Sequence, residues 1–168
     1  VGNDDDLRQV VTGKTGAFAG MAKGAILVDH TTASAAVARE LENAAKEKGL
    51  GFLDAPVSGG QAGAVNGKLT VMVGGAAESF KRAEPLMRSY GHAVTLMGPA
   101  GNGQLTKMVN QICIAGVVQG LSEALNFAVR AGLDAKQAVQ VISKGAAQSW
   151  QMENRAATMI DGQFDFGF

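Results

Sequence analysis

The chain of 168 residues has few of the side chains that bind metals or form cross-links. It holds one cysteine, Cys113, and two histidines, His30 and His92, which lie far apart in the sequence. A single cysteine excludes an internal disulfide and a cysteine-based zinc site, and the histidines have no ligand spacing. No metal site is therefore expected. Cys113 has apolar neighbours and is predicted to be a buried thiol.

The sequence also lacks an excess of either charge. Lys and Arg total 15 and Asp and Glu total 15, so the formal net charge is zero. Nucleic acids and anionic membranes attract a basic surplus, so neither is an expected partner. The longest apolar runs are shorter than the roughly 20 residues of a membrane helix, and residues 1–4 do not resemble a signal peptide. We expect a soluble, cytoplasmic protein.

From residue 1 to about residue 98, short β-like runs alternate with helical ones. The expected strands are 25–29, 50–57, 69–73 and 93–97, and the expected helices are 35–48 and 77–90. Ser34 and Gly49 supply start and stop signals for the first of these helices, and Pro85 is expected to divide the second. Strands that alternate with helices predict an α/β sheet, mostly parallel.

After Gly98-Pro99 the pattern becomes wholly helical. The expected helices are 101–131, 135–143 and 149–160, with Asp134 as the cap of the second. The chain is therefore expected to hold an α/β domain, residues 1–98, and a helical domain, residues 99–168, that begins with the long helix. The α/β part has no opening strand and no Gly-rich first turn, so we expect it to be partial. The helical domain is expected to be incomplete at its C-terminus.

The long helix carries a lysine on an otherwise apolar surface. Lys107, Asn110 and Gln111 are spaced i, i+3 and i+4, so they share one face. A helix that is apolar nearly all round is expected to be buried. Burial near a helix N-terminus lowers the pKa of an amine toward neutrality, which suits a general acid or base. Alternatively, Lys107 extends to solvent and the two amides line an edge.

The segment DAPVSGGQAGAVNGK, residues 54–68, crowds four glycines and a proline behind an apolar run. Backbone N–H groups around Ser58, Gly59 and Gly60 can form a concave anion site at a strand end. The alternative is a tight strand-to-helix turn. Thr31 and Thr32 follow another strand, where their hydroxyls could meet a cofactor ribose or phosphate. Helix-cap or turn duty explains these two threonines equally well.

Two motifs together resemble the β-hydroxyacid dehydrogenase family. They are Asp54-Ala55-Pro56-Val57-Ser58-Gly59-Gly60, followed by Gly63-Ala64, and the G-x-G-x-x-x-K-x-x-N of Gly101 to Asn110. The family includes 3-hydroxyisobutyrate dehydrogenase and tartronate semialdehyde (2-hydroxy-3-oxopropionate) reductase, with 6-phosphogluconate dehydrogenase as a distant relative. The resemblance covers the whole chain. It implies the C-terminal part of a Rossmann-type domain, then a long helix and an all-helical domain, in a homo-oligomer (dimer or tetramer).

The resemblance also implies an activity and a set of site residues. The activity is hydride transfer between NAD or NADP and a short 3-hydroxy acid or semialdehyde, a small carboxylate substrate. The implied site has Lys107 as the catalytic acid/base, Ser58, Gly59, Gly60, Asn110 and Gln111 at the substrate, and Asn3 and Thr32 at the cofactor. Several members have Asn at both positions of the polar pair, so Gln111 is a departure. The region that distinguishes NAD from NADP would lie before Val1.

Two other functions fit the same residues. One is a non-catalytic scaffold of the same fold, against which a buried lysine argues because burying an amine is costly. The other is a phosphosugar-binding α/β enzyme that uses Ser58, Gly59 and Gly60 for phosphate. A preference for a simple carboxylate over a phosphate would favour the dehydrogenase.

Overall fold

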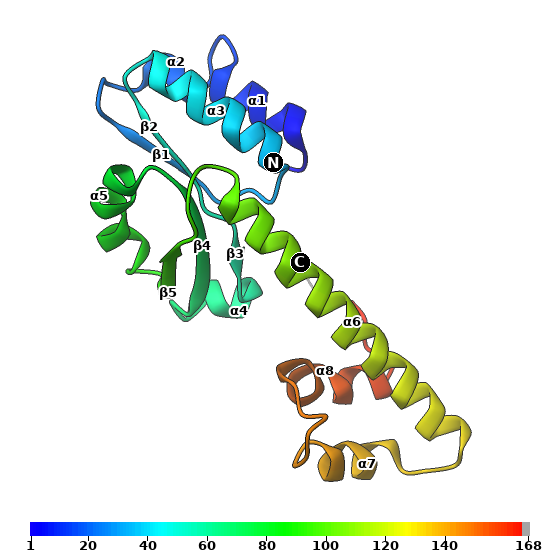
Figure 1. Ribbon diagram of the computed structural model, residues 1–168. Helices are drawn as coiled ribbons and strands as arrows, with labels where there is room; N and C mark the ends of the chain where they lie inside the picture. Colours follow the sequence, from blue (N-terminus) through cyan, green and yellow to red (C-terminus); the bar gives the residue numbers. More distant parts are fainter. Residues whose placement is uncertain (166–168) are drawn as a thin grey trace. The chain divides into compact units, whose positions relative to one another are not determined.

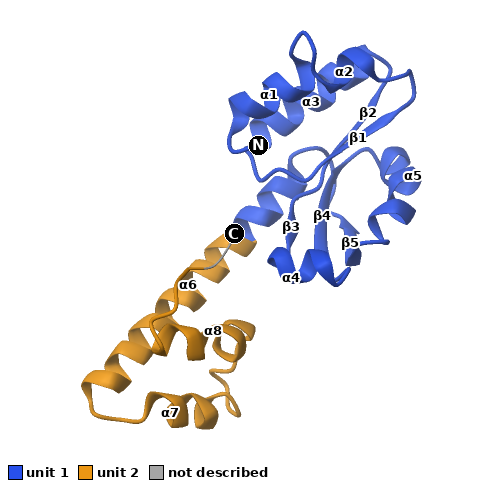
Figure 2. Cartoon of the chain, turned by 180° about the vertical axis from the view of Figure 1, so that it is seen from behind, with its two compact units in different colours: residues 1–109 blue, residues 110–168 orange. Residues whose placement is uncertain are grey.

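A computed structural model describes residues 1–165 and divides the chain into two compact units, residues 1–109 and 110–168 (Figure 2). The division falls inside the long helix α6 (Asn102–Arg130). The domain boundary expected at residue 98 stays a prediction.

The first unit holds a five-stranded sheet with helices on both faces (Figure 1). Its elements are α1 (Asp4–Thr12), α2 (Ala17–Gly20), β1 (Ile26–Asp29), α3 (Ala35–Glu47), β2 (Gly51–Asp54), β3 (Val57–Ser58), α4 (Gly60–Val65), β4 (Leu69–Gly75), α5 (Ala77–Met87), β5 (Gly91–Leu96) and the start of α6. The strand order is β1-β2-β4-β3, and β5 also pairs with β4.

The expectation of a mostly parallel sheet was wrong, because the sheet is mixed. Strands β1 and β2 are parallel, as are β4 and β5, whereas β2 and β3 both run antiparallel to β4. The expected strand 50–57 is interrupted at Ala55-Pro56, which separates β2 from β3. Only residues 59–68 join β3 to β4, fewer than a crossover to a parallel neighbour needs.

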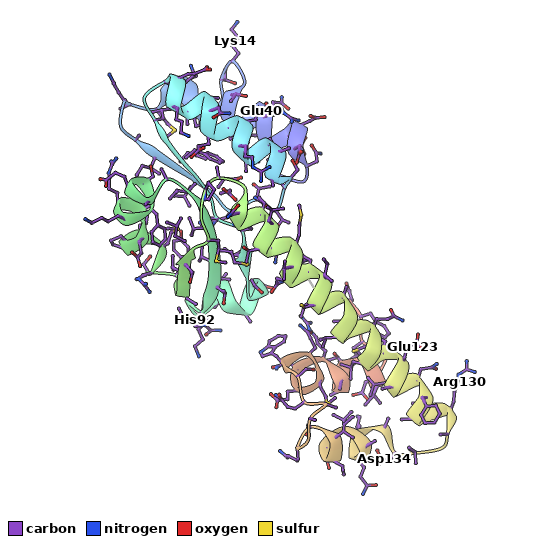
Figure 3. All side chains as sticks on the ribbon, in the orientation of Figure 1. Lys14, Glu40, His92, Glu123, Arg130 and Asp134 are labelled. Atoms are coloured by element: carbon purple, nitrogen blue, oxygen red, sulfur yellow. The ribbon has the colours of Figure 1, made fainter. Side chains whose placement is uncertain are left out.

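Alternation along β1 and β2 builds two hydrophobic cores, one on each face of the sheet. Leu27 and Phe52 face a cluster with residues of α1 and α3, whereas Val28 and Leu53 face a cluster with residues of α5. This period of two is what a strand buried on both faces requires. On the outer surface Arg8 of α1 pairs with Glu40 of α3 at 2.9 Å, and Figure 3 shows Glu40 on that helix.

The second unit contains the rest of α6, with α7 (Ala135–Ile142) and α8 (Trp150–Ile160). A small core joins α6 to α8, formed by Leu121, Leu125, Met152 and Ala156. The side chain of Asp134, labelled in Figure 3, caps α7 by accepting the Gln137 N–H at 3.0 Å. The predicted cap is thereby confirmed.

The predicted start of α3 agrees with the structure, whereas the predicted break inside α5 does not. Ser34 caps α3 as predicted, its hydroxyl accepting the Val37 N–H at 3.0 Å. Pro85 does not divide α5, which continues through it to Met87. A proline removes one backbone hydrogen bond, and the remaining bonds of α5 are enough to carry the helix two residues further.

Burial of the long helix differs from the expectation. In the second unit α6 exposes large apolar side chains, including Ile112 at 73% and Phe127 at 68%. Cys113, predicted to be buried, is exposed. The apolar pattern predicts a buried surface, but among residues 1–165 these side chains of α6 stay exposed. The length and hydropathy of α6 would also suit a membrane span, a test that core helices of soluble proteins pass as well.

Candidate active site

The carboxylate of Asp54 fixes the start of α6. Asp54 ends β2 and is fully buried, and its Oδ1 and Oδ2 accept the N–H groups of Gly101 at 2.8 Å and Gln104 at 3.0 Å. Burial raises the pKa of Asp54, the two backbone hydrogen bonds act against that rise, and the nearby Asp29 charge adds to it. These bonds satisfy N–H groups that a helix start leaves without partners.

Gly103 lets the same helical turn lie directly on the strands. A Cβ at this position would be 2.5 Å from the Met72 carbonyl oxygen and 2.6 Å from the Asp54 carbonyl oxygen. No side chain fits at those distances, so the turn needs glycine there. The approach places the next turn of α6 against the start of β3.

Lys107 lies on that next turn and is buried, with 9% of its surface exposed. Its Nζ donates to the carbonyl oxygen of Val57, at 2.8 Å, so the side chain reaches the residue just before Ser58. Burial lowers the pKa of Lys107. The alternative in which Lys107 extends to solvent is therefore wrong. An amine held inward with a lowered pKa gives up its proton more readily than an exposed lysine, which suits a general acid or base.

The segment around Ser58, Gly59 and Gly60 is a tight turn from β3 into α4, open to solvent at both glycines. Gly59 has φ +133° and ψ −11°, a conformation that other residues rarely adopt, and a Cβ there would lie 3.2 Å from Leu69 Cδ2. The turn alternative is thus confirmed as the local geometry. Its use as a carboxylate site stays a prediction.

The Thr31–Thr32 loop follows β1 and is held by a residue that the sequence did not single out. Gln104 of α6 is 1% exposed, and its Nε2 donates to the Thr31 carbonyl oxygen at 2.7 Å. Its Oε1 accepts the Ala33 N–H at 3.0 Å. Thr32 itself is exposed. The only sequence signal for Gln104 is its spacing of one helical turn before Lys107.

His30 connects the loop that follows β1 to the loop that follows β2. Its Nδ1 lies 2.6 Å from the Ala55 carbonyl oxygen, and its Nε2 lies 2.9 Å from the Tyr90 hydroxyl. A carbonyl can only accept, so Nδ1 carries a proton and donates to Ala55. Burial raises the pKa of Tyr90.

The remaining predicted site residues have local partners. The Asn3 side chain caps α1 by accepting the Asp6 N–H at 2.9 Å. Asn110 and Gln111 begin the second unit, and Asn110 Nδ2 donates to Gln111 Oε1 at 2.9 Å. Their contacts with a cofactor or substrate stay predictions.

Comparisons with known proteins agree with this Rossmann-like α/β fold and the helical part that follows it. Residues 1–98 match the family model described as the NAD binding domain of 6-phosphogluconate dehydrogenase, and residues 101–168 match that described as the NAD-binding domain of NADP-dependent 3-hydroxyisobutyrate dehydrogenase. The chain belongs to the family of these NAD-binding dehydrogenase domains. The predicted fold class is confirmed, as is the predicted cofactor class, NAD or NADP, at the level of the family.

Individual relatives point the same way. An uncharacterised oxidoreductase of Shewanella frigidimarina is 65% identical over 100% of this chain and 58% of its own length. The 2-hydroxy-3-oxopropionate reductase of Escherichia coli is 38% identical over 96% of this chain and 56% of its own. The crystal structure of 3-hydroxyisobutyrate dehydrogenase from Salmonella typhimurium has a TM-score of 0.86 and 33% identity, covering 97% of this chain and 57% of that one. The chain thus spans little more than half of these relatives.

Replacement of Asp54 by asparagine should destabilise the first unit. One oxygen of the carboxylate becomes an amide NH₂, which cannot accept the N–H of Gly101 or Gln104. A buried donor left without a partner costs about 1–3 kcal/mol, and urea denaturation would measure the loss in the free energy of unfolding. Asp5→Asn, on the exposed surface, is the control and should cost about 1 kcal/mol or less. Equal losses from the two variants would contradict the role given to Asp54.

Proposed function

We propose that the protein is an NAD- or NADP-dependent oxidoreductase that interconverts a short 3-hydroxy acid and its semialdehyde. Lys107 carries the proposal, because its Nζ is buried and bonded to Val57 beside the Ser58–Gly60 turn. The relatives named as 3-hydroxyisobutyrate dehydrogenase and 2-hydroxy-3-oxopropionate reductase support this substrate class. The proposal concerns the whole protein, and this chain spans 56–57% of the length of those two relatives.

A nicotinamide cofactor would bind at the edge of the sheet formed by the carboxyl ends of β1 and β2. Asp29 and Asp54 are register partners at these ends, and the exposed Thr32 follows β1 at the edge where α/β sheets bind such ligands. Thr32 would contact the cofactor, with Asn3 also in the loops that approach it. A bound reduced nicotinamide would supply hydride to the carbonyl carbon of the substrate.

Lys107 would handle the proton of the same reaction. As the carbonyl carbon is reduced, negative charge grows on its oxygen, and the Lys107 ammonium stabilises this charge and donates a proton to it. In the oxidising direction the neutral amine removes the proton from the substrate hydroxyl. The hydrogen bond to the Val57 carbonyl oxygen holds Nζ in place for both directions.

The Ser58–Gly60 turn would fix the substrate carboxylate. Ser58 is half-buried, and Gly59 and Gly60 are exposed, so a small anion can approach the backbone there. Holding the carboxylate places the carbonyl at a set distance from Lys107, which is the positional part of catalysis. Asn110 and Gln111 would complete the polar surroundings of the substrate.

Lys107→Ala should abolish turnover and leave substrate affinity largely intact. A panel of short semialdehydes with NADH and with NADPH, followed by nicotinamide absorbance, would identify substrate and cofactor. Lys81→Ala, at an exposed lysine, is the matched control and should keep full activity. Near-full kcat in Lys107→Ala would remove the proton-transfer role. Inactivity of the unaltered protein with every semialdehyde, combined with phosphate binding, would favour the phosphosugar alternative.

The reaction should depend on pH in opposite ways in its two directions. Burial lowers the pKa of Lys107, so the ammonium is lost at a pH below the ordinary value of about 10.4. Reduction needs the ammonium, so its kcat/KM should fall as pH rises through that pKa. Oxidation needs the amine, so its kcat/KM should rise over the same range. Profiles that stay flat up to the ordinary lysine value of about 10.4 would contradict the assignment.

We also propose that the protein forms a homo-oligomer, in line with the exposed apolar side chains of α6. Unpartnered apolar surface of this kind often marks an interface between subunits. Light scattering of the purified protein would give its mass, and a monomer at micromolar concentration would rule this out.

A further inference from the structure

We propose that Gln104 is a positioning residue that fixes the backbone on both sides of Thr32 and so sets the cofactor-contacting loop against Lys107. The inference rests on the proposed function, because it assigns Thr32 to the cofactor and Lys107 to proton transfer. Gln104 itself touches neither the substrate nor the cofactor in this scheme.

The Gln104 amide is fully used by the loop. Its Nε2 donates to Thr31 at 2.7 Å and its Oε1 accepts from Ala33 at 3.0 Å, so one side chain holds the residue before Thr32 and the residue after it. The amide is buried, where an unbonded polar group would be costly. A residue with only a packing role needs no polar atoms, so two matched bonds to one loop indicate that the position of the loop matters.

Thr32 is the exposed residue of the loop whose position Gln104 would set. Among residues 1–165, no hydrogen bond involves its backbone or its hydroxyl. The loop is tied at its ends, where Thr31 N–H donates to Asp29 at 3.0 Å and Ser34 N–H donates to Asp4 at 2.9 Å. The exposed Thr32 is therefore placed by its two neighbours, and both are held by Gln104.

The same turn of helix links this loop to the acid/base. Gln104 and Lys107 are three residues apart on α6, and the N–H of Gln104 is itself bonded to the buried Asp54. The loop, the helix start and the lysine are thus linked by a continuous set of hydrogen bonds. A misplacement of about 1 Å between reacting groups can slow a reaction about a hundredfold, so such a tether acts on rate as well as on binding.

The test compares Gln104→Leu with Gln104→Glu, and uses Gln9→Leu on the exposed side of α1 as the matched control. In Gln104→Leu the dissociation constant for NADH or NADPH, measured by fluorescence, should rise about tenfold, and hydride transfer should slow by at least as much. The KM for the semialdehyde should stay within about twofold of the value for the unaltered protein. The pH at which activity changes should move by no more than about 0.3 pH units, since the variant changes no charge.

Gln104→Glu gives a rescue that depends on pH. The ionised carboxylate can accept from Ala33 but cannot donate to Thr31, whereas the protonated acid can do both. Its cofactor affinity, taken as a ratio to the unaltered protein at each pH, should therefore recover as pH falls. This variant also serves if Gln104→Leu fails to fold.

A readout independent of activity tests the tether itself. The Ala33 amide should exchange its hydrogen faster in Gln104→Leu, while the Ala38 amide within α3 keeps its rate. Unchanged exchange at Ala33, or a lowered unfolding free energy with unchanged cofactor affinity, would overturn the inference. Inactivity of the unaltered protein would instead overturn the proposed function, and the Ala33 exchange would still report on the tether.

Discussion

The rest of the site depends on one contact, in which the buried carboxylate of Asp54 accepts hydrogen bonds from two backbone N–H groups. This contact sets where α6 begins and which way its first two turns face. From those turns Gln104 reaches the loop that follows β1, and Lys107 reaches the first residue of β3. A negative group at a helix N-terminus is favoured by the helix dipole, which offsets part of the cost of burying Asp54.

Local signals in the sequence predicted most of the elements but not the pairing of the strands. Ser34 and Asp134 were expected caps and act as such, because a cap is a contact between neighbours in the chain. Strand direction is decided by connection length and by the break at Ala55-Pro56, which a run of apolar residues does not reveal. The mixed sheet therefore differs from the parallel one that alternation of strands and helices suggested.

In the candidate site, too, the sequence predicted local features but not contacts between distant segments. Lys107 stood out because a cation on an apolar helix is unusual, and its burial is confirmed. Gln104 did not, because its two bonds join residues more than 70 positions apart and leave no local trace. Cys113 was misjudged for a related reason: apolar neighbours in sequence predict a preference for burial, and only packing in space decides whether it is met.

The close contact at the start of α6 also limits how this sequence can diverge. A Cβ at Gly74 would lie 2.5 Å from Asp54 Oδ1, and one at Gly103 would lie 2.5 Å from the Met72 carbonyl oxygen. Positions 54, 74 and 103 therefore share one small volume, although they come from three different elements. A larger side chain at either glycine would have to displace the carboxylate or the helix. Substitutions at these three positions are therefore coupled, and homologues that keep the aspartate should keep both glycines.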